Sequence, residues 1–526
     1  MPLPPSDVTW PPAALARITP VLDEWSAWYE GTPESLSTVY GSASTATARA
    51  AGLRGFLRRM WWGRDTGVES ERRDQLHLPL AADIARGSAD LLYAEPPTLS
   101  VAGEQNGDGQ SATQARLDEY VDDGLHSILA TGAEVGAALG GRFHRVTWDA
   151  EVRDTPFLTT VDADAAWPTF RWGRLVGVTF WRVVRREGQT TWRHLERHEL
   201  DASGIGLVFH GLYQGSSTNL GHAVPLEDAD ATRGLAAAVD ADGALVEGRT
   251  PGLCVEYIAN QLPQRRWRTD AVGQYLGRSD FDGVEQLMDA LDETYSSLMR
   301  DIRLGKGRII VPSYMLETAG PGRGAVFDLD RSVYEAVRSA PPEDGHGDIT
   351  PQQFDIRVDE HLRACEDMAL RVVQGAGYST QTFAERTDGG QMTATEVHSR
   401  ERRSYLTRDR KIRNERPAVS RLAQKMLSID QAVFRTPGLV PGAVDVTFGD
   451  TVQDSMITLA QTAQALTVAR AASTATRVHL VHPDWTEVQV QDEVRLILAE
   501  DAGEVLADPD DVPPAGQVED VDLERA

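Results

Sequence analysis

The chain has 526 residues, 41% of them hydrophobic, with 12 tryptophans, which excludes global disorder and predicts several domains. A net charge of −27 disfavours nonspecific binding of nucleic acid by the outer surface. No apolar run predicts a membrane span, and the N-terminal residues lack the pattern of a secretion signal. Cys254 and Cys365 lie far apart in sequence, which favours a reducing compartment without structural disulfides.

Residues 1–75 are hard to assign. Their clearest pattern is a set of apolar residues at helical spacing with arginines between them: Leu53, Phe56, Leu57, Met60 and Trp61. This pattern suits a membrane-surface or nucleic-acid helix, or a packing helix with a basic outer face. The packing helix is favoured because the rest of the chain shows no membrane signal.

Residues 76–140 predict two helices, the first ending before Pro96-Pro97 and the second running from about Thr113 to Leu139. A β-rich region follows. Three predicted strands are separated by short turns and make an antiparallel meander: Leu175–Val184, Thr191–Leu200 and Ile205–Tyr213. The first half of the chain is therefore expected to be α+β.

A small β-containing module is predicted between two amphipathic helices. The first helix covers residues 279–304, with apolar side chains at three- and four-residue spacing, and the second covers Asp359 to about Gln374. The expected strands between them are Arg308–Val311, Ala325–Leu329 and a segment near Phe354–Ile356.

A long basic helix follows the paired glycines Gly389-Gly390. Thr393 and Glu396 form a capping box, and the helix runs on to Leu427, with a kink expected at Pro417. From residue 396 to 425 it has ten basic residues and four acidic ones. Its partner could be an acidic protein surface or nucleic acid, and the two alternatives stay open at this point.

The C-terminal part contains a predicted strand, two predicted helices and an acidic tail. The strand is Val444–Phe448, and the helices cover 452–472 and 484–500. Residues 501–526 are rich in acids and prolines and are expected to be a disordered tail.

Tests for chemistry are negative. Gly305-Lys306-Gly307-Arg308 fails as a phosphate loop, because Arg300 stands where a glycine is needed and Gly307 replaces the Ser or Thr. His194 and His198 fall on one face of a predicted strand, but far apart, and no third zinc ligand stands out. They are interpreted as surface or interstrand histidines. No catalytic signature is present, so we expect no enzymatic activity, cofactor or metal.

Four stretches, together with the order of the elements, resemble a known family. They are Leu76–Ala85, Met288–Tyr295, Met299–Arg308 and Thr393–Val397. An α+β region, a long helix, a β-rich insertion, a second helix, a glycine-containing loop and a long helix follow one another. In this order the chain resembles the portal protein, or head–tail connector, of tailed double-stranded DNA bacteriophages. The likeness is greatest to portals of long-tailed siphophages of Gram-positive hosts.

The resemblance implies an α+β, mainly helical, ring-forming portal fold with wing, stem, clip and crown regions. The wing would be 1–280, the stem helices 281–304 and 356–375, the clip 305–355 and the tunnel loop 376–392. A long kinked wing helix would cover 393–430, the crown 431–500, and the tail 501–526. The alternatives are another capsid-associated structural protein and, with only size and acidity in its support, an acidic α+β hydrolase.

The same resemblance implies the function and the site residues. Twelve subunits would form a ring at one capsid vertex, through which genomic DNA is packaged and ejected. The tunnel loop around the DNA would use Thr380, Gln381, Arg386, Thr387, Asp388, Gly389, Gly390 and Gln391. Subunit or DNA contacts would use Arg400, Arg402, Arg403, Arg408, Arg410, Lys411 and Arg413, and partner docking at the clip Lys306, Arg308 and Arg323.

The implied partners are double-stranded DNA, the terminase large subunit and then a head-completion or adaptor protein. The major capsid protein and a scaffolding protein would be further partners, and no membrane is involved. The implied location of this late protein is the portal vertex of the virion, with the host cytoplasm during assembly.

Overall fold

The computed structural model describes residues 3–40, 75–102, 111–304, 308–312, 334–337, 350–352, 357–383, 394–449, 456–482, 485 and 487–504. The chain divides into two compact units, one of residues 1–391 with 398–449 and the other of residues 392–397 with 450–526. About half of the described residues are helical and the fold is α+β, as the sequence predicts.

Both helices predicted over residues 76–140 are present. The first is α6 (Leu80–Leu92); the second is split into α7 (Ala112–Tyr120) and α8 (His126–Leu139). The split is a π-helical turn in which Gly124 has a φ of 92°, a left-handed conformation that an α-helix cannot continue through. The single predicted helix is therefore corrected to two.

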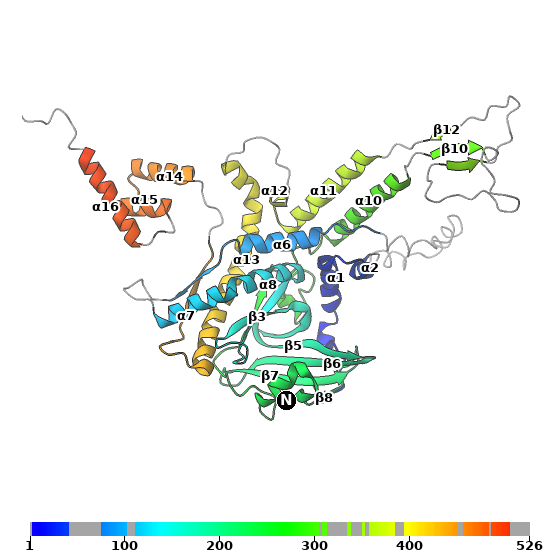
Figure 1. Ribbon diagram of the computed structural model, residues 1–526, viewed down its shortest axis with the longest axis horizontal. Coiled ribbons are helices and arrows are strands. Elements are labelled where there is room, and N and C mark those ends of the chain that lie inside the picture. The colour runs from blue at the N-terminus through cyan, green and yellow to red at the C-terminus, as the bar shows by residue number, and fades with distance from the viewer. Residues whose placement is uncertain are drawn as a thin grey trace, which may run out of the picture. The chain divides into compact units, whose positions relative to one another are not determined.

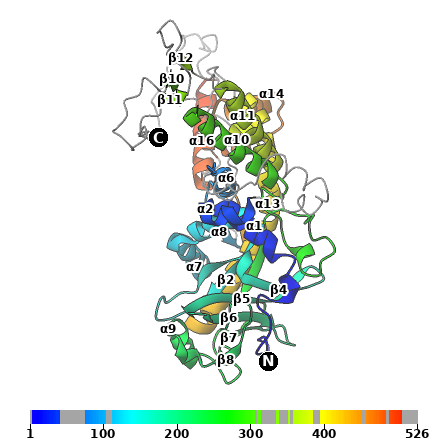
Figure 2. The same cartoon turned by 90° about the vertical axis from the view of Figure 1, so that its right-hand side faces the viewer.

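The predicted meander forms the centre of a five-stranded antiparallel sheet with the order β4-β5-β6-β7-β8. Its strands are β4 (Ala166–Arg171), β5 (Arg174–Glu187), β6 (Thr190–Leu200), β7 (Gly206–Gly215) and β8 (His222–Val224). Figure 2 shows β5, β6 and β7 following one another across the sheet. The edge strands β4 and β8 were not predicted.

A second sheet, β3-β2-β9, packs against the first. Its strands are β2 (Gly141–Thr147), β3 (Phe157–Asp162) and β9 (Val255–Ala259). Phe143 and Val255 of this sheet form one apolar cluster with Val178 and Phe180 of β5. Farther along, β1 (Thr98–Val101) pairs with β13 (Val444–Thr447), which confirms the strand predicted near residue 444.

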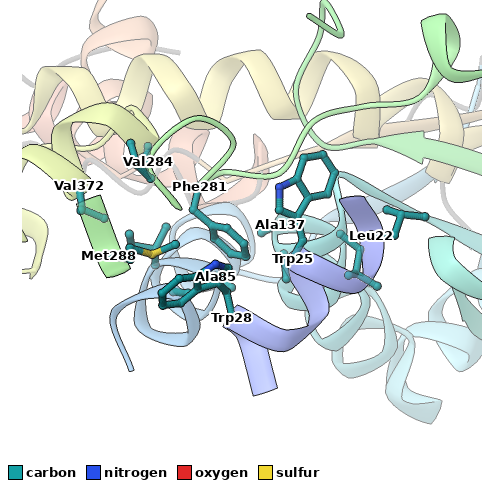
Figure 3. Close-up of a cluster of buried hydrophobic side chains, with 14 of the residues drawn as sticks. Leu22, Trp25, Trp28, Ala85, Ala137, Phe281, Val284, Met288 and Val372 are labelled. Carbon is teal, nitrogen blue, oxygen red and sulfur yellow. The ribbon is translucent and has the colours of Figure 1, made fainter. Parts of the chain in front are cut away.

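Part of the N-terminal segment builds the main core. Helices α1 (Thr19–Glu30) and α2 (Pro33–Val39) precede α6, and Trp25 and Trp28 of α1 are fully buried. Figure 3 shows them among Ala85, Ala137, Phe281, Val284, Met288 and Val372, from segments far apart in sequence. The helix predicted around Leu53 and Trp61 lies outside the described residues.

Helices α10 (Glu285–Leu304) and α11 (Val358–Ala376) confirm the predicted helical pair and lie side by side (Figure 1). Between them in sequence, β10 (Arg308–Pro312) pairs with β11 (Tyr334–Val337) in parallel and with β12 (Thr350–Gln352) in antiparallel. The strand prediction at 308–311 is confirmed, whereas β11 and β12 were missed. Residues 325–329 and 354–356 lie outside the described part.

The long basic helix is α13 (Ala394–Ile429), and it continues through Pro417 into a π-helical turn, Asp430–Phe434. The proline therefore does not end it. In the second unit the two predicted helices are present as α14 (Met456–Val468) and α16 (Glu487–Glu504), and α15 (Thr474–Val481), which was not predicted, lies between them in sequence. Residues 505–526, most of the predicted tail, lie outside the described part.

Candidate functional site: the long helix and the junction beneath it

Helix α13 has an exposed basic face. The exposed side chains between residues 402 and 416 are Arg402, Arg403, Leu406, Asp409, Arg410, Arg413 and Arg416. Their spacing of three and four residues places most of them on one side of the helix. Within the described part of the chain, Arg402, Arg410, Arg413 and Arg416 make no hydrogen bond or ion pair. This face is free to meet a negatively charged surface.

The opposite face of α13 carries buried charges, and the most connected of them is Lys411. Its Nζ donates to Asp280 Oδ2 at 2.7 Å and also to the Ser88 hydroxyl of α6. Lys411 and Asp280 are both almost completely buried, at 3% and 2% exposure. Such a pair is stable only when hydrogen bonds satisfy the rest of both groups.

Asp280 is satisfied from several segments. The Tyr378 hydroxyl donates to its Oδ2 at 2.7 Å, and the amides of Asn260 and Gln261 donate to its Oδ1 at 2.8 and 2.6 Å. Its own backbone N–H donates to Ala137 O at the end of α8. Asp280 therefore joins the segment before α10, the segment after α11, α8 and α13 at one point.

Burial governs the titration of this junction. It lowers the pKa of Lys411, although the nearby Asp280 carboxylate acts in the opposite direction. It raises the pKa of Tyr378 well above its usual value, and the Asp280 charge raises it further. Tyr378 therefore stays protonated and neutral at every physiological pH, and its hydroxyl donates a hydrogen bond to Asp280.

A second buried pair lies one turn farther along α13. Arg142 of β2 donates to Glu415 at 2.9 Å, and the Tyr93 hydroxyl donates to the same oxygen at 2.9 Å. Arg142 also donates to His144, whose pKa is held well below its usual value by burial and then by the Arg142 charge. These contacts attach α13 to the sheet β3-β2-β9.

The C-terminal end of α13 is fixed by polar contacts as well. Lys425 Nζ donates to the carbonyl oxygens of Thr250, Pro251 and Gly252 at 2.7–3.1 Å. Beyond it, buried Asp430 accepts from Arg116 Nε at 2.6 Å and from the Tyr120 hydroxyl. The helix is held along its length by groups that sequence spacing does not pair.

The predicted basic site residues divide between the two faces. Arg408 and Lys411 were expected at a subunit or DNA contact, but both are buried, and Arg408 donates to Leu91 O and Gly449 O. Arg403 is exposed yet donates to Gln374 O at 2.6 Å. Burial inside the chain gives Arg408 and Lys411 a different role. For Arg402, Arg410 and Arg413 the contact stays a prediction, as it does for Arg400, whose side chain is not described.

Two of the predicted tunnel-loop residues are placed. Thr380 and Gln381 lie in α12 (Thr380–Phe383), directly after α11. This segment is tied to α13, because the Ser404 hydroxyl accepts from Ser379 N at 2.8 Å and Thr407 donates to Gly377 O at 2.7 Å. Residues 386–391, with the other predicted loop residues, lie outside the described part.

Of the three residues expected to dock partners, only the backbone of Arg308 is described, at the start of β10. Lys306 and Arg323 lie outside the described residues. The nearby helices show where another surface could bind. Val358, Leu362 and Leu370 of α11 lie on one side of the helix, with Glu366 between the last two, and are 36–44% exposed. An apolar stripe of this kind is typical of a helix that packs against a further element.

The histidines of β6 are interstrand residues, as expected, but they have partners that the sequence did not indicate. His194 Nε2 lies 3.1 Å from His210 Nδ1 of β7, and His198 Nε2 lies 2.6 Å from Glu196 Oε1. Across the described residues no group of His, Cys, Asp and Glu has an arrangement suited to a metal ion. No described helix is long and apolar enough to cross a membrane.

Asp280, Tyr378 and Glu415 were missed as key residues. Nothing in their local sequence distinguishes them, because each has a hydrogen-bond partner more than 90 residues away in sequence. The only available signal was indirect: too many charges on α13 for one solvated face.

Comparison with known proteins identifies the family. Residues 255–505, which span α10, the β10–β12 sheet, α11, α13 and all of α16, match the sequence model described as phage portal protein, SPP1 Gp6-like. No curated protein matches the chain. The chain therefore belongs to the phage portal protein family of the SPP1 Gp6-like type, and it is a structural, non-enzymatic component of the virion at the capsid vertex.

Proposed function

We propose that twelve copies of this chain form a closed ring at the vertex and that genomic DNA passes through the ring during packaging and ejection. Family membership implies an oligomeric ring with a DNA channel. The number of subunits and the division into wing (1–280), stem (281–304 and 356–375), clip (305–355), tunnel loop (376–392), long wing helix (393–430) and crown (431–500) belong to the proposal.

The observation that carries the ring is the apolar stripe on α11. Leu362 and Leu370 keep 42% and 44% of their surface exposed although α11 packs along α10. In a ring, the stripe of one subunit is covered by the helix pair of the next, which makes a continuous helical barrel. A contact between two different surfaces produces a closed ring when the rotation that relates neighbouring subunits brings the last subunit back to the first.

In this ring, α12 and the residues between it and α13 line the channel and touch the DNA, through Thr380, Gln381, Arg386, Thr387, Asp388, Gly389, Gly390 and Gln391. The exposed arginines of α13 face an acidic surface of a neighbouring subunit. Net charge supports this division, because each subunit carries −27 and offers acidic surface to a basic helix face. The clip, with Lys306, Arg308 and Arg323, docks the terminase large subunit and afterwards a head-completion or adaptor protein; the major capsid and scaffolding proteins bind elsewhere on the ring.

Electron microscopy and native mass measurement of the purified chain test the ring. Rings with an open centre and twelve subunits are expected, whereas a monomer under all salt and concentration conditions contradicts the proposal.

The basic face is tested by Arg402→Gln, Arg413→Gln and Arg416→Gln combined. We expect this variant to dissociate at lower salt while DNA contact in intact rings is unchanged. A loss of DNA contact in stable rings would assign these arginines to DNA instead.

A further inference from the structure

An exposed tryptophan stands at the tip of the hairpin that joins β4 and β5. Trp172 is 94% exposed, the largest exposed fraction among the large apolar side chains described as exposed. Arg171 and Arg174 flank it and face each other across the turn. Both arginines are exposed and, in the described part of the chain, neither makes an ion pair. Tryptophan and arginine are the residues most enriched at the energetic centres of protein interfaces.

The backbone at this tip is also unfavourable for tryptophan. Trp172 has a φ of 52° and Gly173 a φ of 74°, the two left-handed residues of a type I′ turn. Asn-Gly is the preferred pair in such a turn, and a bulky residue in the left-handed region is an outlier. The chain therefore accepts both strain and solvent exposure at Trp172, and among the described residues no hydrogen bond or ring contact of Trp172 compensates for either.

The hairpin is held firmly, so its tip is presented in one place. Phe170, next to the tip, makes ring contacts with Tyr275 at 5.3 Å and with Tyr257 at 6.0 Å between centroids. Tyr257 is part of the cluster that joins the two sheets. A hairpin that is already anchored loses little backbone freedom when its tip binds, which favours a specific partner.

The opposite edge of the same sheet has a hollow of ≈ 760 Å³ beside β7 and β8. Its apolar lining includes Leu212, Val224, Leu226 and Val239, and its acidic lining residues are Glu227, Asp240 and Asp242. The described lining residues include no lysine or arginine. Asp240 is already paired with Arg249, whereas Glu227 and Asp242 are exposed. The hollow thus combines an apolar surface with unneutralised negative charge.

We propose that Trp172 of one subunit inserts into this hollow on the next subunit, with Arg171 and Arg174 beside Glu227 and Asp242. The proposal rests on the ring proposed above and adds the wing contact between neighbours. The sheet order places β4 at one edge and β8 at the other. One subunit can therefore use the hairpin tip and the hollow at the same time, each toward a different neighbour. A head-to-tail ring requires two different, complementary surfaces of this kind.

Double-stranded DNA fits the tip less well than the second copy does. Aromatic side chains bind nucleic acid by stacking on unstacked bases, which a DNA duplex does not present. The hollow, in contrast, offers apolar lining residues for an indole and carboxylates for the two arginines.

The first test is Trp172→Asn, which removes the indole side chain and places at position 172 a residue that tolerates the left-handed backbone. We expect an unchanged or higher melting temperature, and at least a tenfold rise in the subunit concentration at which half of the protein is in rings. Val152→Asn is the matched control, because Val152 is also exposed, at 68%, but is not part of the contact. Rings unaffected by Trp172→Asn overturn the contact alone, whereas parent protein that never forms rings overturns the ring as well.

The second test is reciprocal charge reversal. Arg171→Glu with Arg174→Glu and, separately, Glu227→Arg with Asp242→Arg should each weaken assembly. Combining all four should restore it, because opposite charges then meet again. Failure of the combined variant to recover assembly, with each variant folded by circular dichroism, overturns the pairing.

The third test is photo-cross-linking from a benzophenone amino acid at position 172 in assembled protein. Mixed isotope labelling shows whether a cross-link joins two copies. The expected cross-linked peptides of the second copy cover residues 222–228 and 236–243. Cross-links to other parts of the chain, or only to capsid protein or DNA in filled particles, overturn the assignment.

Discussion

Lys411 Nζ lies 2.7 Å from Asp280 Oδ2, and the two side chains are sealed from solvent. This ion pair joins the middle of α13 to Asp280, which lies in the short segment before α10, the first helix of the α10–α11 pair. Tyr378, which follows α11, donates to the same carboxylate oxygen. The start of one helix, the end of the other and the helix that follows the loop are therefore fixed to one carboxylate, so that a displacement of the loop end is opposed at the base of both helices.

Replacing Lys411 by Met should lower the free energy of unfolding of the subunit by about 3–5 kcal/mol, because the Asp280 carboxylate is left buried without its counter-charge. Urea unfolding monitored by circular dichroism measures the change. Arg410→Met, one residue earlier and on the exposed face, should change the free energy of unfolding by less than about 0.5 kcal/mol. Equal effects of the two substitutions would contradict the structural role of the pair.

Stability should fall as the pH is lowered from about 6.5 to about 4.5. Burial lowers the pKa of His194 to about 3 and that of His210 to about 4. The unfolded chain binds protons near pH 6.5 while the folded chain does not, so protonation favours unfolding as the pH falls. Each histidine adds a slope of up to about 1.4 kcal/mol per pH unit.

The double variant His194→Gln with His210→Gln should show a shallower slope in pH-dependent denaturation. Asp164 acts in the opposite direction, since burial raises its pKa to about 6, but it is common to both proteins. The pKa of Glu196 is held well below its usual value by the Arg145 charge and the His198 hydrogen bond against the effect of burial, so its contribution is lost only below this window. Identical slopes for parent and variant would show that these histidines are not protonated on unfolding.

Leu362→Asp with Leu370→Asp should abolish rings and leave the subunit folded. Both side chains are already partly in water, so their replacement costs the subunit little, whereas a charge on the stripe would be buried between subunits. Mass photometry over a range of concentrations measures the loss. Arg363→Asp, also on α11 and exposed but beside the stripe, is the control and should still form rings.

Gly389→Val with Gly390→Val should reduce DNA packaging more than ring formation. Glycines permit loop conformations that β-branched residues resist, and the tunnel loop is proposed to touch the DNA in the channel. Packaged DNA per capsid is compared with ring yield. Gly234→Val is the control, because an added Cβ there has open space and an ordinary backbone conformation. Normal packaging by the double variant would remove this loop from the mechanism.

Local periodicity was enough to find α6, β5, β6, β7, α10, α11 and α13. Each is long and strongly patterned, and the turns between the strands have the usual residues. The short strands β4, β8, β11 and β12 were missed because three to six residues carry too little pattern. Gly124 divided a predicted helix because a left-handed backbone angle leaves no mark on apolar spacing.

The sequence by itself determined the order of helices, sheet module and loop, and with it the resemblance to portal proteins, because these features depend on neighbours a few residues apart. The tertiary structure decided which charges of α13 are used inside the subunit and which face outward. Lys411 and Asp280 are 131 residues apart in sequence, and the local sequence around either residue does not predict that the two pair. Likewise, the local sequence marks Trp172 as an ordinary apolar residue, and only the fold places it exposed at a hairpin tip. Burial and long-range pairing depend on the whole chain, and they alone separate the residues that hold the subunit together from those left to bind a partner.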